Sequence, residues 1–301
     1  MPTNAAFTLT PVNSNNVSCF GGSNGSAEVT VNPPGDYTIN WNNGATGTFI
    51  SSLTSGFYQC TATDATGCAS SPVSFFISQP SEINSNLYIG YPIFCFGDTT
   101  GTLICNPSGG TGDHLVVWST GEMSDTLSGI GAGEYSLYVT DQNNCIISDT
   151  LVLGQPSVLM VNLVEIDSIL CFGDTTGGIY IEATGGVGNY SFLWSSGQDS
   201  TFINDVGAGL YSVSVSDGNN CRTVQDFELT QPDEINVNAT ITPVTPGSGN
   251  NGAISLDVSG GTGIVNVTWS NGFSGDTIDN LSVGIYTATI TDESGCSDTL
   301  S

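Results

Sequence analysis

The stretch GLYSVSVSDGNNC, residues 209–221, determines the fold of this 301-residue chain. From Tyr211 to Ser216 large and small side chains alternate, and a period of two with one wet face is typical of an antiparallel β-strand. Asp217 and Cys221 then enclose a short segment of Gly and Asn, which favours a tight turn. The stretch therefore predicts a strand followed by a turn that ends in a cysteine.

The same strand and turn recur three more times, as GFYQCTATDATGC at 56–68, GEYSLYVTDQNNC at 133–145 and GIYTATITDESGC at 284–296. The tryptophans follow the same period, with spacings of 77, 76 and 75 residues between Trp41, Trp118, Trp194 and Trp269. A fixed period of this length indicates tandem copies of one structural unit. We place the repeats at residues 1–80, 81–156, 157–232 and 233–301, the last of which stops before its final strand is complete.

A second motif precedes each tryptophan, as CFGGSNG at 19–25, CFGDTTG at 95–101 and 171–177, and PGSGNNG at 246–252. Together with the patterns GG.G.YSF.WS.G and AG.YS.SVSD..NC, it resembles the SprB repeat of very large surface adhesins from gliding bacteria. The resemblance implies an extracellular, cell-surface protein that is exported by type IX secretion and acts in adhesion or gliding. Its expected partners are a surface polysaccharide or solid substratum and the neighbouring repeats of the same chain.

We interpret the chain as a fragment of such an adhesin, serving as stalk and adhesive surface. The alternative is an array of carbohydrate-binding modules attached to a secreted polysaccharide-degrading enzyme. Exposed aromatic rings repeated across the copies would favour this alternative, and Tyr138 and Phe273 are the candidates.

The expected fold of each repeat is an immunoglobulin-like β-sandwich, because short strands follow one another every 8 to 12 residues with Gly, Asn and Asp between them. No segment has a helical pattern. The alternation before each tryptophan places the four rings in the core as central packing residues. Gln-Pro joints without a flexible Gly/Ser run predict stiff connections, so the tandem array is expected to form an elongated rod.

Charge excludes two classes of partner. The chain has 28 acidic residues and Arg222 as its one basic residue, for a formal net charge of -27. Nucleic acids and anionic membrane surfaces require several Lys or Arg side chains. No apolar run approaches the length of a membrane span, so direct membrane insertion is not expected either.

We do not expect the chain to be an enzyme. A Ser-His-Asp triad needs a histidine, and the only one, His114, aligns with Tyr37, Tyr190 and Val265 of the other copies, which indicates a structural side chain. Catalysis by carboxylates alone would need a pair of acidic residues. The four copies share no such pair.

The cysteines predict disulfides, because a chain without lysine has no isopeptide cross-link to strengthen its small repeats. Spacings of 49, 50 and 50 residues favour pairing within repeats, as Cys19 with Cys68, Cys95 with Cys145 and Cys171 with Cys221. The alternative joins neighbours across the boundaries, as Cys68 with Cys95 and Cys145 with Cys171. Four strands are expected between Cys171 and Cys221, and an even number of alternating strands would return the chain to the same end.

Three cysteines are expected to be free. Cys296 lacks a partner in its own repeat because Pro246 occupies the corresponding position. Cys60 and Cys105 align with core positions of the other copies, which predicts buried thiols.

Pairing within repeats would also bring Asp98 close to Asp141, and Asp174 close to Asp217. Two carboxylates at one pole, with Thr, Asn and carbonyl oxygens nearby, predict a calcium site in the second and third repeats. The alternative is that each aspartate only caps its own turn. No other cofactor is expected.

The resemblance also implies O-glycosylation wherever Asp is followed by Ser or Thr and then a small or aliphatic residue. The hydroxyl residues in such triplets are Thr99, Thr126, Thr150, Ser168, Thr175, Ser200, Thr277 and Thr299.

Overall fold

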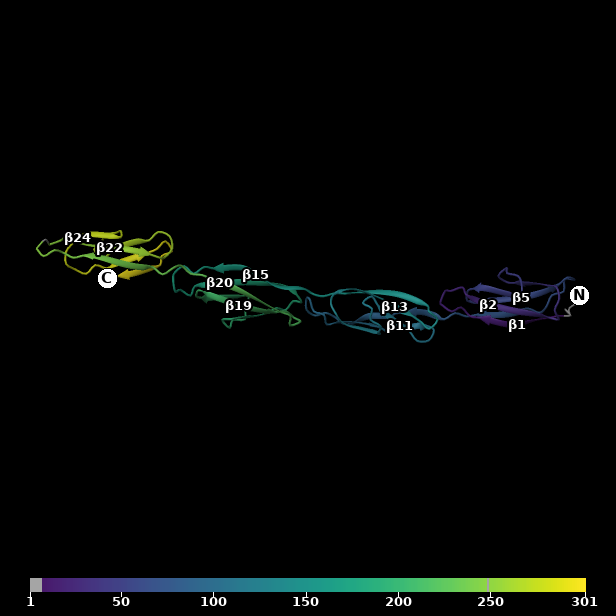
Figure 1. Cartoon of the computed structure of the whole chain (residues 1–301). Helices are drawn as coiled ribbons and strands as arrows, with labels where there is room; N and C mark the ends of the chain where they lie inside the picture. The colour runs from purple at the N-terminus through teal and green to yellow at the C-terminus, as the bar shows by residue number, and fades with distance from the viewer. Residues whose placement is uncertain (1–6, 248) are drawn as a thin grey trace. The chain divides into compact units, whose positions relative to one another are not determined.

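A computed structural model describes residues 7–247 and 249–301 of the chain. All regular elements over these residues are β-strands. The same residues contain no helix long and apolar enough to cross a membrane. The chain divides into two compact units, one of Met1–Ile93 with Gly97–Gln155 and one of Phe94–Phe96 with Pro156–Ser301. Figure 1 shows their strands as arrows, coloured by residue number. The first unit contains the first repeat and the second repeat without Phe94–Phe96, and the second unit contains these three residues with the third and fourth repeats.

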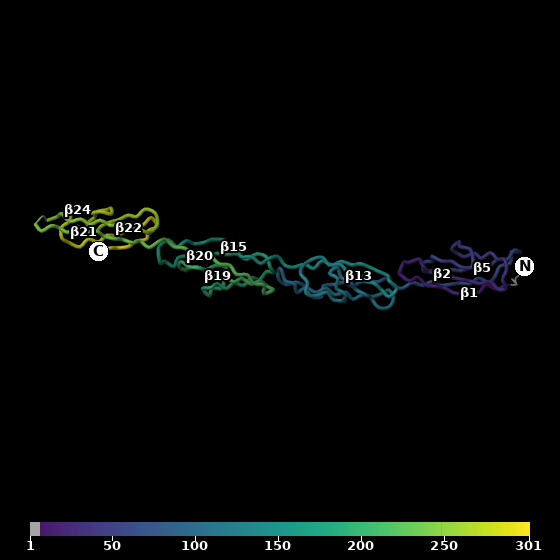
Figure 2. The backbone as a smooth tube through the Cα atoms, viewed as in Figure 1, coloured from purple at the N-terminus to yellow at the C-terminus, as the bar shows by residue number. Residues whose placement is uncertain are grey.

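The third repeat shows the common plan most clearly. Its strands are β15 (Ser157–Asp167), β16 (Gly177–Gly186), β17 (Ser191–Trp194), β18 (Phe202–Val206), β19 (Gly209–Ser216) and β20 (Arg222–Leu229). They form two antiparallel sheets of order β15-β16-β18 and β17-β19-β20, which Figure 2 shows as a backbone trace. The predicted immunoglobulin-like sandwich is therefore confirmed, and the difference from the seven-stranded form is that the fourth strand is missing.

The other repeats follow the same plan. The first contains β1 (Thr8–Asn15), β2 (Gly25–Asn32), β3 (Tyr37–Trp41), β4 (Phe49–Leu53), β5 (Gly56–Asp64) and β6 (Val73–Ile77). The fourth contains β21 (Asn236–Thr242), β22 (Gly252–Ser259), β23 (Asn266–Trp269), β24 (Thr277–Leu281), β25 (Ala288–Thr291) and β26 (Ser297–Leu300). Their sheets are β1-β2-β4 with β3-β5-β6, and β21-β22-β24 with β23-β25-β26.

In the second repeat the first two strands are each interrupted. It contains β7 (Ser81–Asn84), β8 (Leu87–Tyr91), β9 (Gly101–Cys105), β10 (Ser108–Gly110), β11 (Leu115–Trp118), β12 (Thr126–Ile130), β13 (Gly133–Thr140) and β14 (Ile146–Leu153). The sheets are β8-β9-β12, β7-β10 and β11-β13-β14.

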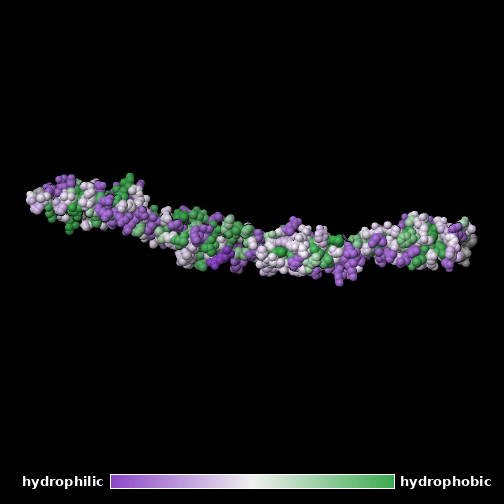
Figure 3. Space-filling model, viewed as in Figure 1, coloured by the Kyte–Doolittle hydropathy of each residue, from purple (hydrophilic) through white to green (hydrophobic). Residues whose placement is uncertain are grey.

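Each repeat has its own hydrophobic core, built from residues of that repeat alone. The predicted burial of all four tryptophans is confirmed: their exposed fractions are 4%, 2%, 2% and 6% for Trp41, Trp118, Trp194 and Trp269. Each indole N–H donates to the carbonyl oxygen six residues later, at 2.9 Å for Trp194 and Ser200. In Figure 3, hydrophobic residues reach the visible face only in separate patches between hydrophilic ones.

A half-buried tyrosine lies near the start of the central strand of the second sheet in every repeat. The hydroxyl of Tyr211 donates to the carbonyl oxygen of Gly207 at 2.9 Å. Tyr58, Tyr135 and Tyr286 make the corresponding bond four residues back. This "tyrosine corner" is a hallmark of immunoglobulin-like sandwiches, and the sequence analysis did not identify it.

The direction of the strands separates the two ends of a repeat. Ser191 of β17 lies opposite Ser216 of β19, whereas Val206 of β18 lies opposite Gly177 of β16. Both β17 and β18 therefore run the same way, because the chain changes sheet between them. Cys171 precedes β16 and Cys221 follows β19, so the two cysteines lie at opposite ends of the repeat. The expectation of one shared end was wrong: the number of strands is four, but they make only three passes.

Candidate functional site at the disulfide joints

The turn that ends in Cys145 is organised by a buried aspartate. Asp141 Oδ1 accepts hydrogen bonds from the backbone N–H groups of Asn143 and Cys145, at 2.9 and 2.8 Å. Its Oδ2 accepts a third bond from the N–H of Thr111 at 2.9 Å. Burial alone would raise the pKa of this carboxyl, but the three backbone donors outweigh it and lower the pKa. Asp141 therefore caps its own turn, as the alternative interpretation expected, but it also binds the backbone of Thr111 outside that turn.

The turn needs a left-handed residue just before the cysteine. Asn144 and Asn220 have φ values of 61° and 64° there, and Gly67 and Gly295 take 87° and 88°. Asn and Gly are the residues that adopt this conformation at least cost, which explains the sequence choice at this position.

The loop that begins with the CFG motif, residues 19–25 in the first repeat, is called the CFG loop here. It is held in place by hydrogen bonds from within its own repeat. Asn24 Oδ1 accepts from the backbone N–H of Ser18 at 2.9 Å, and its Nδ2 donates to the Ser18 hydroxyl at 2.7 Å. Gln79, which closes the repeat, accepts from the N–H of Gly21 at 2.9 Å. The loop is thus fixed at the end where the next repeat begins, and Cys19 lies within it.

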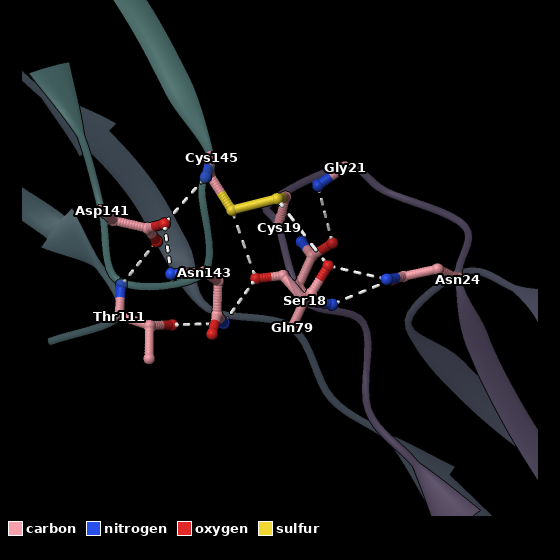
Figure 4. The surroundings of a disulfide bond; sticks show 9 residues. All are labelled: Ser18, Cys19, Gly21, Asn24, Gln79, Thr111, Asp141, Asn143 and Cys145. Atoms are coloured by element: carbon pink, nitrogen blue, oxygen red, sulfur yellow. Dashed lines mark hydrogen bonds between the residues drawn. A yellow bond between two sulfur atoms is a disulfide. The ribbon is translucent and has the colours of Figure 1, made fainter.

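In the first unit these two parts meet across the joint between repeats (Figure 4). Cys19 and Cys145 form a disulfide with a Cα separation of 5.6 Å. The amide of Asn143 donates to the carbonyl oxygen of Ser18 at 3.0 Å and to the Thr111 hydroxyl at 3.2 Å. The Sγ atom of Cys145 lies 3.4 Å from the same Ser18 oxygen.

The second unit contains the same arrangement twice. Cys95 bonds Cys221, and Cys171 bonds Cys296, each with a Cα separation of 5.5 Å. The Asn219 amide donates to the carbonyl oxygen of Phe94 at 2.9 Å, as Asn143 does in the first unit. The fourth repeat has Ser294 at this position, and its disulfide forms without that amide.

These bonds correct the predicted pairing. Each disulfide joins the CFG loop of one repeat to the turn of the following repeat, with a sequence separation of 126, 126 and 125 residues. The pairs Cys19–Cys68, Cys95–Cys145 and Cys171–Cys221 were wrong, and so was the alternative of Cys68–Cys95 and Cys145–Cys171. The physical reason is the odd number of strand passes, which places the two half-cystines of one repeat at opposite ends.

The free thiols change accordingly. Cys296, predicted to be free, is bonded to Cys171, and Cys68, predicted to be bonded, is a half-buried free thiol. Cys60 and Cys105 are free and buried, as predicted. Burial raises the pKa of each of these two thiols to about 11.

The shared pole expected for calcium was also wrong. Asp98 lies beside Gly131 at one end of the second repeat, and Asp141 lies beside Gly110 at the other. Asp174 lines a cavity of about 440 Å³ in the second unit whose lining does not include Asp217. The other acidic residues of the lining are Asp233, Glu234, Asp292 and Asp298. Within the described residues, no group of three or more His, Cys, Asp or Glu side chains is arranged to hold a metal ion.

The remaining predicted residues are placed as follows. His114 Nε2 lies 2.9 Å from the carbonyl oxygen of Gly109, the position that the Tyr190 hydroxyl takes against Gly185 in the third repeat. Tyr138 and Phe273 are exposed, at 56% and 57%. Seven of the eight candidate glycosylation residues are exposed, and Ser200 is half-buried.

The SprB repeat family matches two parts of the chain, residues 12–46 and 163–199, which confirms the resemblance drawn from the sequence. No curated protein matches the chain in sequence. Three N-terminal domains of the bacteriophage RB49 Highly Immunogenic Outer Capsid protein (Hoc) are similar in structure, with 12% identity, 75% of this chain and 99% of that chain covered, and a TM-score of 0.35. Sidekick-1 immunoglobulin domains 1–5 give 13% identity, 97% and 75% coverage, and a TM-score of 0.29. The N-terminal eight Ig domains of the Down Syndrome Cell Adhesion Molecule give 14% identity, 98% and 47% coverage, and a TM-score of 0.29.

Proposed function

We propose that the chain is part of an extracellular adhesin, in which the repeats serve as stalk and adhesive surface at the cell surface during attachment or gliding. The proposal includes export by type IX secretion. It also includes a surface polysaccharide or a solid substratum as the binding partner of the chain. The matches to SprB repeats in two of the four copies support the class of protein.

The observation that carries the proposal is where the disulfides lie. Within the part of the chain that the structure describes, all three disulfides join successive repeats and none lies inside a repeat. Disulfides of small secreted domains usually stabilise the domain itself, whereas these connect one domain to the next. Covalent joints of this kind suit a protein whose task is to hold its repeats in series. Disulfides persist in oxidising environments, which supports a secreted or extracellular protein.

The two aromatic candidates, Tyr138 and Phe273, favour a stalk over an array of carbohydrate-binding modules. Tyr138 aligns with Thr61, Ser214 and Thr289, and Phe273 aligns with Ala45, Glu122 and Gln198, so neither ring recurs. An exposed phenylalanine does recur after three of the half-cystines, as Phe20, Phe96 and Phe172. Each is a single ring within the loop that carries the half-cystine, and these three are the rings to replace in the glycan-binding test.

No feature of the joints suggests catalysis. The carboxylates of Asp141 and Asp217 are occupied by backbone N–H donors, and the thiols of Cys60 and Cys105 are buried with raised pKa values. The matched proteins are repeat and immunoglobulin-like domains. The exposed Asp-Ser/Thr triplets, among them Thr99 and Thr175, remain proposed glycosylation sites.

The test is an antibody raised against this chain and applied to intact source cells. We expect it to label unpermeabilised cells and to inhibit their attachment to a solid surface, while the purified chain shows no saturable binding across a panel of soluble glycans. Labelling only after permeabilisation would contradict the surface location. Saturable glycan binding that is lost on replacing exposed aromatic residues would instead favour the carbohydrate-binding array.

A further inference from the structure

We propose that the disulfides make this chain a tether that tension cannot lengthen by unfolding its repeats. The inference follows from the shortest covalent path between the two ends of the chain. It deepens the proposed stalk role, but its test measures the isolated chain, so its outcome is independent of whether cells use the chain for adhesion.

The path through the second repeat is a single strand. Cys145 is bonded to Cys19 of the first repeat, and β14 (Ile146–Leu153) leads directly from Cys145 to Gln155 at the other end of the repeat. Leu153 packs there against Gly101 of the CFG loop region, which confirms that the strand reaches that end. The rest of the second repeat, residues 81–144, therefore lies off the shortest path.

The third repeat is crossed in the same way by its first strand. The chain enters it directly after Pro156, and β15 (Ser157–Asp167) leads to Cys171. Cys171 is bonded to Cys296 of the fourth repeat, so residues 172–295 also lie off the path. The first repeat contributes only its first strand and the loop up to Cys19.

The shortest covalent path between Phe7 and Ser301 consists of residues 7–19, 145–171 and 296–301, joined by two disulfides. These are about 46 residues, which at roughly 3.5 Å each can span at most about 160 Å. Most of them lie in β1, β14, β15 and β26, and a β-strand already rises about 3.3 Å per residue, so unfolding these strands lengthens the path only slightly. Without disulfides the same two ends are separated by about 295 residues, or roughly 1,000 Å when extended.

The three disulfides are not equivalent in this respect. Cys95–Cys221 does not lie on the shortest path, so its removal leaves the limit of extension unchanged. Removal of Cys19–Cys145 forces the path through residues 7–95, back from 221 to 171, and on through 296–301. That route has about 146 residues, so the limit rises roughly threefold, to about 500 Å.

The experiment is single-molecule force spectroscopy of the whole chain held by handles at its two ends. We expect the oxidised wild type to show no length gain of the size of a repeat, and the chain in excess dithiothreitol to show stepwise gains of roughly 200 Å as each repeat unfolds. The matched variants each lack one disulfide. Cys95→Ser with Cys221→Ser should behave as the wild type, and Cys19→Ser with Cys145→Ser should extend about threefold further.

Repeat-sized steps in the oxidised wild type or in the Cys95/Cys221 variant would overturn the proposal. Equal limits of extension for the two variants would overturn it as well, because a purely stabilising role gives no reason for the pair on the path to differ from the pair off it. Circular dichroism of both variants before pulling verifies that their strands are formed. Should a variant fail to fold, the comparison of oxidised with reduced wild type still decides the outcome.

Discussion

The turns that end in Cys145 and in Cys68 are built alike, yet only the first carries a disulfide. In both, an aspartate accepts the N–H of the cysteine, at 2.8 Å for Asp141 and 2.9 Å for Asp64. The difference lies outside the turn: Cys145 meets the CFG loop of the preceding repeat, whereas Cys68 meets no such loop within the described residues and is free. The turn is therefore set by its own sequence, and the bond is set by the neighbouring repeat.

The prediction with the largest expected effect concerns the disulfide between Cys171 and Cys296, which can be tested by cleavage at Arg222. Trypsin can cleave only after Arg222, giving fragments 1–222 and 223–301. Because Cys171 and Cys296 lie on different fragments, we expect these to stay joined without reductant and to separate with it. The free thiols are first blocked with N-ethylmaleimide in denaturant, so that the bonds cannot exchange, and the products are weighed by mass spectrometry.

A Cys296→Ser variant is the control for that digest, and its fragments should separate without reductant. If the wild-type fragments also separate without reductant, Cys171 is bonded to a cysteine within 1–222, as pairing inside the repeat would require. Such a result would break the comparison, because the two turns would then no longer differ through their neighbours.

The second prediction concerns the three free thiols under native conditions. Cys60 and Cys105 are each 1% exposed with pKa values raised to about 11, so only about one such thiol in a thousand is ionised at pH 8. Cys68 lies half-buried in its surface turn. Iodoacetamide at pH 8 should therefore add one group to the native chain, at Cys68, and three groups after unfolding.

Mass spectrometry of the native and unfolded samples measures both numbers, and a Cys68→Ser chain should take up no label while folded. Two or more groups on the native wild type would show that a core thiol is accessible. No group at all would show that Cys68 is protected as Cys145 is, and the difference between the two turns would disappear.

Much of each repeat could be predicted because the signals are local. Alternation of side chains predicted the strands and the burial of Trp194, and the alignment of copies predicted the burial of Cys60. The pairing of cysteines could not be predicted in the same way, because it depends on the direction of β17 and β18 after the chain changes sheet. The number of unpaired cysteines does not distinguish the two schemes. Apart from the two core thiols, pairing within repeats leaves Cys296 unpaired, and the observed pairing leaves Cys68 unpaired.

The shared pole expected for calcium was wrong for the same reason, since that expectation took its geometry from the predicted disulfides. Asp141 and Asp217 were recognised as turn residues, but the third backbone donor to each comes from a residue 30 positions earlier. No spacing rule connects Thr111 to Asp141. The contact appears only when β10 and the turn after β13 are brought to the same end of the repeat.

The prediction with the smallest expected effect is a difference in stability between variants of Asp141 and Asp64. Asp141 is buried and accepts from Thr111 as well as from its own turn, whereas Asp64 is half-exposed and accepts only from within its turn, including the Thr66 hydroxyl at 2.7 Å. Asp141→Asn places an amide against three N–H donors and leaves at least one of them unsatisfied, which costs about 1–3 kcal/mol of the free energy of unfolding. Asp64→Asn, the matched control, should cost less, because water can replace the lost bonds. Hydrogen exchange of residues 133–153 and 56–77 in the full chain measures the two effects separately.

Acid provides the second half of this test. Backbone donors hold the pKa of Asp141 below its ordinary value of 3.8 despite burial, so the folded state binds its proton less readily than the unfolded state. The stabilisation is therefore fully present at neutral pH and is lost as the pH falls below about 4 toward the lowered pKa. The gap in protection between wild type and Asp141→Asn should shrink over that range and should not change between pH 5 and 7. A gap that stays constant into acid would mean that shape rather than charge makes Asp141 matter, and the turn of Cys145 would then gain no stability from the negative charge of this side chain.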